Sequence, residues 1–272
     1  MCMFKKMTGV GLLLLLMSIL ICGCGAEEEE KAQSEQLPEL VVGCDNYSPF
    51  SYADADGDMT GIDVELAREA FSRMGYTPQF VFINWEDKKD LLADGTIDCI
   101  WSSFTMTGRE NEYHWAGPYM RSRQVVAVNE DSDIYTLQDL EDKVIAVQNT
   151  TKPEDIIRSH DGTLPNLRKV ISVQKRDLIF ILLSKGYVDA LAAHDTSVDQ
   201  FMEDTGLQYR ILEEPLQSVE LGVAFDKSDT RGLHTQLTEV LHEMQEDGTT
   251  ERIIGEYLQN AEDYLEGGNA ED

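Results

Sequence analysis

The alternation of two kinds of apolar pattern between residues 39 and 248 is the feature that most constrains the fold of this chain. Short apolar runs such as 39–44 and 143–148 have the length and composition of buried β-strands. Between them, stretches such as 63–75 and 231–248 carry apolar residues at helical spacing and end in a glycine that can close a helix. Strands and helices in alternation predict an α/β fold with largely parallel sheets.

The N-terminus has the order of a secretory signal. Two lysines precede the apolar run 10–21, which is too short for a comfortable transmembrane helix. With an apolar residue at −3 and a glycine at −1, Cys24 resembles the first residue after a bacterial lipobox. That resemblance implies that residues 1–23 are a lipoprotein signal peptide and that Cys24 carries a diacylglycerol and acyl chains such as palmitate. Two acyl chains give stable membrane anchoring.

A plain signal peptide that happens to contain cysteines is the alternative, and the coincidence of small-residue site and cysteine disfavours it. Cys22 is a poorer lipidation site, because Ile21 would then stand at −1. Residues 24–37 are acidic, polar and without apolar periodicity, which predicts a disordered tether. Residues 261–272 are expected to be a frayed acidic tail.

The chain carries a strong excess of acidic residues. With 51 Asp and Glu against 22 Lys and Arg, its formal net charge is −29. Such a surface repels nucleic acid and anionic lipid headgroups, so neither is an expected partner. The excess does not specify the charge of a ligand, because a solvated acidic surface is the better explanation for it.

Cysteines and acidic clusters give no indication of a metal or another cofactor. Once the signal is removed and Cys24 is lipidated, Cys44 and Cys99 remain. A disulfide is possible outside the cytoplasm, but both lie in expected core strands, which favours free buried thiols. No zinc-like cysteine spacing is present. The run 54–58, DADGD, lacks the spacing of a calcium loop and fits a hairpin turn.

The stretch IDCIWSSFTMTGRE is the clearest candidate for a binding site. Ser102 and Ser103 end an apolar strand, and ligands bind at the carboxyl ends of strands in open α/β sheets. Thr105 and Thr107 precede an expected helix start, where unpaired N–H groups favour an anion. Arg109 offers a planar fork that can grip a carboxylate through two hydrogen bonds. A surface position on that helix is the alternative for Arg109.

Further along the chain, two expected helix starts carry polar side chains. Thr151 and Glu154 in QNTTKPE fit a capping box, and the same turn directs free N–H groups toward a cleft. Asn149 tolerates a left-handed backbone. Asp195 follows the strand DALAA and fits the N-cap of the next helix. His194 beside it would neighbour a side-chain pocket, although a single loop histidine is more often solvated.

Taken together, these motifs resemble bacterial extracellular solute-binding proteins of the polar amino-acid type, family 3, which serve ABC importers. The resemblance rests on VVGCDNYSPFSYADADGDMTGIDVELAREAF, IDCIWSSFTMT, GPY, RQVVAV, AVQNTT, GYVDAL, GVAF and EDGTTERI. It covers nearly all of residues 40–258, and the motifs are specific as a set.

The resemblance implies the two-lobed class II fold of periplasmic binding proteins, with two crossing strands as the hinge. Lobe 1 is then 38–121 plus 220–260, and lobe 2 is 122–219. The crossings fall near 119–123 and 218–222. The ligand is expected between the lobes, which close over it.

The resemblance also implies site roles. In the family, the region of SSFTMTGRE holds the α-carboxylate of the ligand. This implies a carboxylate role for Ser102, Ser103, Thr105 and Arg109. Only Gly108 separates Thr107 from Arg109, whereas the family usually has two residues there. The turn Asn149, Thr150 and Thr151 serves the same carboxylate, with Asn149 in place of the usual glycine.

Asp195 from lobe 2 matches the acid that binds the α-ammonium, although it stands one residue farther from Asp189 than usual. Tyr47 and Trp85 match positions that sandwich the ligand's side chain, and flat rings can pack an alkyl stem or attract a cation. Asp45 receives no role, because its interval to Tyr47 is shorter than in typical binders of basic amino acids.

The resemblance therefore implies a monomeric, lipid-anchored substrate-binding protein on the extracytoplasmic face of the bacterial cell membrane. It would capture a free amino acid, which the sequence leaves unidentified, and deliver it to the permease of an ABC importer. A sensory or partner-presenting lipoprotein with the same pocket is the first alternative. A dehydratase-like enzyme on the same fold is the second, disfavoured because the chain shows no nucleophile elbow, HExxH or triad spacing.

Overall fold

A computed structural model describes residues 37–160 and 162–265 of the chain. The predicted signal peptide, Cys24, the predicted tether up to residue 36 and the last seven residues of the predicted tail lie outside the described residues. No helix in the described part combines the length and apolar character needed to cross a membrane.

One mixed sheet joins most of the strands, in the order β4-β1-β5-β11-β6-β9-β7-β8, with β10 paired to β6. Its strands are β1 (Glu39–Cys44), β4 (Thr77–Phe82), β5 (Cys99–Ile100), β6 (His114–Asn129), β7 (Val144–Gln148), β8 (Lys169–Val173), β9 (Ala190–His194), β10 (Tyr209–Ile211) and β11 (Gln217–Phe225). A separate hairpin pairs β2 (Tyr52–Ala53) with β3 (Met59–Thr60). This hairpin is the predicted turn at DADGD.

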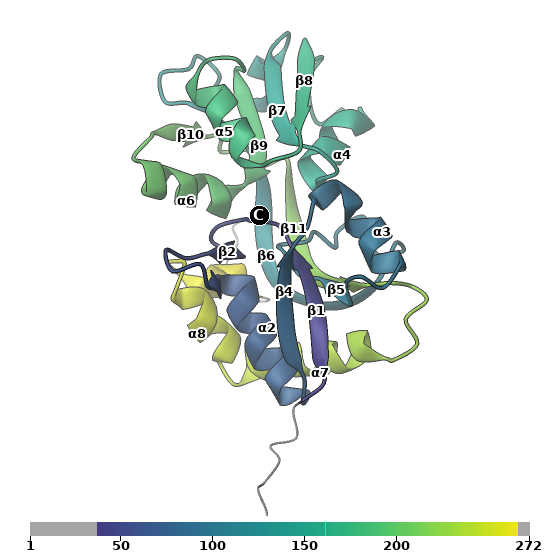
Figure 1. The fold of residues 1–272 in the computed structure, drawn as a ribbon. Helices are drawn as coiled ribbons and strands as arrows, with labels where there is room; N and C mark the ends of the chain where they lie inside the picture. Colours follow the sequence, from purple (N-terminus) through teal and green to yellow (C-terminus); the bar gives the residue numbers. More distant parts are fainter. Residues whose placement is uncertain (1–36, 161, 266–272) are drawn as a thin grey trace, which may run out of the picture. The chain divides into compact units, whose positions relative to one another are not determined.

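Helices cover the sheet on both sides of its centre (Figure 1). The α-helices are α2 (Ile62–Arg73), α3 (Lys88–Ala93), α4 (Lys152–Ser159), α5 (Asp177–Ser184), α6 (Asp195–Thr205), α7 (Leu233–Glu246) and α8 (Thr249–Gly255). The 3-10 helices are η1 (Trp85–Asp87), η2 (Leu137–Leu140) and η3 (Ala261–Tyr264).

Strands β6 and β11 run antiparallel to each other and connect two halves of the molecule, as Figure 1 shows. Their pairing extends from Gln217 opposite Gln124 to Phe225 opposite His114, with an irregularity between Leu221 and Val223. Within each half, β1 is parallel to β4 and β5, and β7 is parallel to β8 and β9, whereas every pair that includes β6 or β11 is antiparallel. The sheet is therefore parallel only within the halves, and it is antiparallel where the two long strands join them.

Each half has its own apolar core. In the first, which we call lobe 1, buried side chains of β1, α2, β11 and α7 pack together, with Phe71 and Leu237 fully covered. In the second, lobe 2, two clusters lie on the two faces of β6, β7 and β9. These separate cores support the two-lobed α/β fold. The residue limits of the lobes stay a prediction.

Three local expectations are wrong. The apolar run 97–103 forms strand only at Cys99–Ile100, and the described residues between Thr107 and β6 form turns instead of the expected helix. The predicted tail begins with η3, whose Ala261 is buried in the core of lobe 1, so the first residues of this segment are packed.

Candidate functional site

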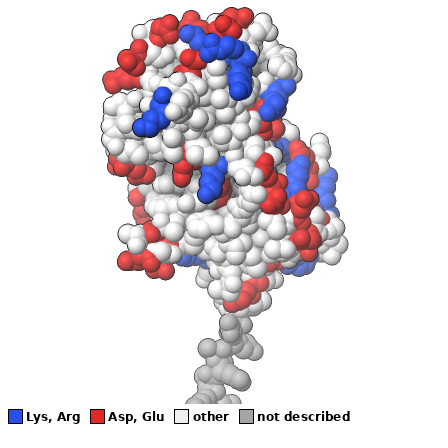
Figure 2. All heavy atoms as spheres, turned by 45° about the horizontal axis from the view of Figure 1, so that its top comes forward, with Lys and Arg blue, Asp and Glu red and all other residues white. Residues whose placement is uncertain are grey.

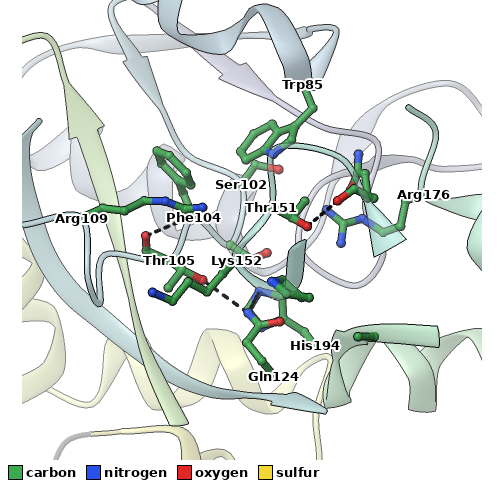
Figure 3. Close-up of a pocket in the computed structure, with 14 residues that line it drawn as sticks. Trp85, Ser102, Phe104, Thr105, Arg109, Gln124, Thr151, Lys152, Arg176 and His194 are labelled. Carbon is green, nitrogen blue, oxygen red and sulfur yellow. Dashed lines mark hydrogen bonds between the residues drawn. The ribbon is translucent and has the colours of Figure 1, made fainter. Parts of the chain in front are cut away.

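A small cavity of about 20 Å³ lies between side chains of the two lobes (Figure 3). That volume holds about one water molecule. Lobe 1 contributes Trp85, Ser102, Ser103, Phe104, Thr105 and Arg109 to its lining. Strand β6 contributes Gln124, and lobe 2 contributes Gln148, Thr151, Lys152, Pro153, Arg176, Ala192 and His194. The cavity therefore lies where polar ends of strands and loops from both lobes meet.

The serine turn after β5 is fixed by buried hydrogen bonds. Ser103 has a left-handed backbone with φ of 42°, and its N–H donates to Asp63 Oδ2 at 2.5 Å. The Ser102 hydroxyl accepts the N–H of Asp45 at 3.0 Å and lies 3.1 Å from Ser51 Oγ. Both serines line the cavity, so the structure brings the predicted pair to one place.

Thr105 and Thr107 join this turn to strand β11 instead of starting a helix. Thr105 forms a bridge with Leu221, and the N–H of Glu220 donates to Thr107 Oγ1 at 2.8 Å. Pairing with a strand more than a hundred residues away has replaced the expected local helix. The N–H groups of a helix start are thus absent from the binding stretch, and only Thr105 of the two threonines lines the cavity.

Arg109 is buried and lines the cavity despite its shortened spacing from Thr107. Gly108 turns the chain between them with φ of 77°, a conformation that glycine adopts without strain. The guanidinium of Arg109 pairs with Asp155 of α4 across the lobes and lies 3.4 Å from the carbonyl of Thr105. The absence of a helix thus removes the alternative that Arg109 is a helix surface residue.

The turn before α4 lines the cavity with Thr151, but it is built differently from the prediction. Thr151 is the N-cap, yet its hydroxyl donates to Gln148 O at 2.6 Å, and Glu154 accepts the N–H of Thr150 at 2.6 Å. The predicted capping box is therefore not formed. Thr150, with φ of 55°, takes the left-handed conformation that we assigned to Asn149, whose side chain instead bonds Glu86 of lobe 1.

Lys88 is a buried cation that sequence reasoning missed. Its Nζ donates to Thr150 Oγ1 at 2.9 Å and to the carbonyl of Trp85 at 3.1 Å, so it links the two lobes. Nζ also lies 4.8 Å from the centre of the Trp85 ring, which lines the cavity. Burial, with a further contribution from Arg109, lowers the pKa of Lys88 to about 8. Nothing in the run EDKKD distinguishes this lysine from its solvated neighbour.

Tyr47 is buried, and its ring face is covered by a residue of lobe 2. The guanidinium carbon of Arg176 lies 3.3 Å from the centre of the ring, and its NH2 is 3.3 Å from Asp45 Oδ2. Gln148 donates to the same carboxylate oxygen at 2.8 Å. Tyr47 itself is not part of the lining, and Arg176 is a second lining cation that the sequence analysis did not identify.

Asp195 is buried at the start of α6 but does not line the cavity. Its Oδ2 pairs with Arg123 Nε at 2.9 Å, and its Oδ1 accepts the N–H of Thr196 at 2.8 Å. The N-cap of α6 is His194, so Asp195 is the first helical residue and not the predicted cap.

His194, which we expected to be solvated, is buried and lines the cavity. Its Nδ1 lies 2.7 Å from Ser122 Oγ, and Gln124 Nε2 approaches its Nε2 at 2.9 Å. Burial lowers the pKa of His194 to about 3, so the ring is neutral at physiological pH. Two polar neighbours on β6 explain how this imidazole is accommodated inside the molecule.

Cys44 and Cys99 are free and buried, which confirms the favoured reading of the cysteines. Within residues 37–160 and 162–265, no group of three or more His, Cys, Asp or Glu is placed to hold a metal ion. The cavity chemistry therefore rests on hydroxyls, amides, aromatic rings and cationic side chains.

Comparison with known proteins gives a consistent result. A model of bacterial extracellular solute-binding proteins, family 3, matches residues 40–260. The Vibrio harveyi protein named "Putative amino-acid ABC transporter-binding protein PatH" is 28% identical over 82% of this chain and 89% of its own length. The histidine-binding periplasmic protein of Salmonella typhimurium is 27% identical over 82% of this chain and 88% of its own.

Solved structures share the fold. A mutant of ArgBP from T. maritima has a TM-score of 0.72 and 29% identity, covering 80% of this chain and 94% of that one. The ancestral amino acid-binding protein AncCDT-1, described as a precursor of cyclohexadienyl dehydratase, has a TM-score of 0.72 and 26% identity. It covers 81% of this chain and 96% of its own.

Proposed function

Because the chain belongs to the bacterial extracellular solute-binding proteins, family 3, we propose that it binds a free amino acid between its lobes and delivers it to the permease of an ABC importer. The observation that carries the proposal is the cavity itself. Hydroxyls and buried cations from both lobes converge on it, and such convergence of polar groups in a cleft is typical of ligand sites.

In this proposal the α-carboxylate binds to Ser102, Ser103, Thr105 and Arg109 of lobe 1, together with the turn Asn149, Thr150 and Thr151 of lobe 2. Arg109 supplies the charge, and its planar fork matches a carboxylate. Asp155, which pairs with Arg109 in this structure, has a side chain that is 53% exposed. When the ligand's carboxylate takes its place on Arg109, water can hydrate the Asp155 carboxylate.

The ligand's ammonium and side chain would meet Asp195, Tyr47 and Trp85. Trp85 already lines the cavity. The other two groups are covered by cations of the chain, Arg123 on Asp195 and Arg176 on Tyr47. An amino acid does not fit in about 20 Å³, so these cations must shift or the lobes must part when it enters.

Contacts between the lobes explain how a ligand could favour the closed form. Lys88 bonds Thr150, and Gln148 bonds Asp45, each pair joining opposite lobes. A ligand that touches both lobes adds contacts that exist only when they are closed, and this difference in contact free energy shifts the hinge equilibrium. The permease would then recognise the closed form.

A calorimetric or thermal-shift panel of the free amino acids tests the binding step. A ligand at 100 times its Kd adds about 2.7 kcal/mol to the free energy of unfolding, or roughly 5–10 °C in melting temperature for a domain of this size. If no amino acid raises the melting temperature, the proposed function is wrong.

Lipid anchoring at Cys24 is part of the proposal, because tethering keeps the loaded protein near its transporter. The full-length chain expressed in bacteria should incorporate a labelled palmitate analogue and sediment with membranes. Cys24→Ser should lose the label and appear in the soluble fraction. Retention of the label in Cys24→Ser would place the acyl group elsewhere.

Delivery is tested by comparing uptake of the identified amino acid in cells with and without this protein. Uptake that depends on the protein supports import, whereas a sensory role predicts unchanged uptake and an altered response to the amino acid. The likeness to a dehydratase precursor adds one check. We expect the ligand to be recovered chemically unchanged after incubation with the protein, and loss of water from it would indicate an enzyme.

A further inference from the structure

The cavity lining is cationic in a strongly acidic protein. Arg109, Lys152 and Arg176 belong to the lining, and no Asp or Glu does. The chain as a whole carries a formal net charge of −29, and acidic side chains are spread in separate groups over the face drawn in Figure 2. Positive charge has therefore been concentrated in the cleft, where it experiences less screening than at the surface.

Two of the three lining cations already have carboxylate partners, whereas the third, Lys152, and the neighbouring Lys88 do not. Arg109 pairs with Asp155, and Arg176 pairs with Asp45. In the described part of the chain, no carboxylate oxygen lies within 4.0 Å of the Nζ of Lys88 or Lys152. Burial lowers the pKa of both lysines, and Arg109 lowers each further by repulsion. An anion in the cavity would relieve this repulsion.

Arg176 covers an aromatic ring and a carboxylate, a pair of groups that can hold a cation. Its guanidinium lies flat on Tyr47 and contacts Asp45, the pairing of ring and carboxylate that attracts a cation. Figure 3 shows Arg176 and Arg109 entering the cavity region from opposite sides. The Nε of Arg176 is buried without a hydrogen-bond partner, so this guanidinium keeps a donor for a ligand that can accept.

We propose that the ligand is an amino acid with a carboxylate side chain, and that Arg176 determines this choice. Arg176 blocks the Tyr47–Asp45 surface against basic side chains and presents a donor to an acidic one. Lys152 in the lining, and Lys88 with its Nζ 4.8 Å from the centre of the lining Trp85 ring, supply the positive charge that the second carboxylate requires. This inference rests on the proposed function, since it specifies which amino acid the same cleft accepts.

The unmodified protein provides the first test, through pairs of amino acids that differ in charge at nearly constant shape. Calorimetry should show that L-glutamate binds at least about tenfold more tightly than L-glutamine, or L-aspartate than L-asparagine, because a buried charged hydrogen bond is worth about that factor. L-Arginine and L-lysine should bind weakly or not at all. Tighter binding of a neutral or basic amino acid overturns the inference but leaves amino-acid binding intact. Binding of no amino acid overturns both.

Arg176→Ala provides the second test, with Lys175→Ala as its matched control. Lys175 precedes Arg176 in the same loop and is exposed, so its removal deletes the same charge outside the cleft. We expect Arg176→Ala to lose at least tenfold in affinity for the acidic ligand and to gain measurable affinity for L-arginine on the freed Tyr47–Asp45 surface. Lys175→Ala should bind as the unmodified protein does.

An unchanged preference for glutamate over glutamine in Arg176→Ala overturns the role of Arg176. The melting temperatures of both variants show whether they are folded. Arg176→Gln keeps a donor without the charge, so it should fold if the alanine variant does not. The preference of Arg176→Gln for glutamate over glutamine should also be reduced. An unchanged preference in this variant likewise overturns the role of Arg176.

Discussion

The carboxylate of Asp63 at the start of α2 holds the backbone N–H of Ser103 at 2.5 Å, although the two residues are 40 positions apart. Its other oxygen accepts the hydroxyl of Tyr119 on β6 at 2.8 Å. Asp63 is buried. Burial raises the pKa of its carboxyl to about 7, although the two hydrogen bonds act in the opposite direction and lower this pKa. A single buried acid thus joins helix α2, the serine turn of the cavity and the long strand β6.

Asp63→Asn should flatten the pH dependence of stability. Because the folded-state pKa of about 7 exceeds the ordinary aspartate pKa of 3.8, the folded protein binds more protons between these values than the unfolded chain. The free energy of unfolding therefore falls as pH rises from about 4 through 7, by at most about 4 kcal/mol from this group. An asparagine at this position can accept the hydrogen bond from Ser103 and donate one to Tyr119, and it does not titrate. The free energy of unfolding of the Asp63→Asn variant should therefore vary less with pH.

Urea unfolding at pH 5.5, 6.5 and 8 measures this slope. The exposed Asp90, exchanged for Asn, is the control, and it should keep the slope of the unmodified protein. Equal slopes for Asp63→Asn and the unmodified protein would show that Asp63 is ionised throughout.

Regular elements of the fold could be predicted because their signals are local. The helical spacing in 63–75 and 231–248 gave α2 and α7 within two residues at each end, and the apolar run 39–44 is β1. The path after Ser103 could not be predicted, because Thr105 pairs with Leu221, a residue far along the chain. Local propensity carries no information about such a partner.

The site was predicted in part for the same reason. Strand ends and turn chemistry point to Ser103, Arg109 and Thr151, which the structure brings together in one lining. Lys88 and Arg176 lie in runs of charged residues that resemble solvated surface, and only tertiary packing buries them. Burial of a long cationic side chain depends on distant neighbours, so no local pattern could have revealed it.

Arg109→Ala should weaken ligand binding by about 10- to 100-fold, the factor expected for one or two charge-assisted hydrogen bonds. Stability should change little, since its partner Asp155 is largely exposed and can be hydrated. Arg109→Lys keeps the charge but not the fork and should be intermediate. Calorimetric Kd values decide the matter, with Arg252→Ala, an exposed arginine of α8, as the control. Full affinity in Arg109→Ala would remove Arg109 from the site.

Asp195→Asn should weaken binding of the amino acid by about tenfold. Binding of the corresponding dicarboxylic acid, which lacks the amino group, should be unaffected. The reason is that the proposed partner of Asp195 is the ligand's ammonium, which competes with Arg123 for the same carboxylate. Arg123→Ala removes that competitor and should tighten binding of the amino acid. Should Asp195→Asn leave the amino acid's Kd unchanged, the carboxylate serves only the start of α6.

Affinity for the proposed acidic ligand should fall as pH rises above about 8. The ammonium of Lys88 attracts an anion, and its lowered pKa means that it loses its proton in this range, well before an ordinary lysine. Burial favours this loss most, Arg109 and Lys89 favour it further, and Asp155 and Asp45 oppose it. An anion stabilises the charged form, so binding near pH 8 should take up protons. Calorimetry in two buffers of different ionisation enthalpy measures that uptake.

Lys88→Met keeps an apolar stem over the Trp85 ring but removes the charge. It should bind the acidic ligand at least tenfold more weakly at pH 7 and lose less affinity between pH 7 and pH 9 than the unmodified protein does. Lys89→Met is the matched control, because the neighbouring Lys89 is exposed and pairs with Glu112 at the surface. It should retain both the affinity and the pH dependence of the unmodified protein. A pH-independent affinity of the unmodified protein between 7 and 9 would exclude Lys88 as the titrating contact, since its proton would then be lost without consequence for the ligand.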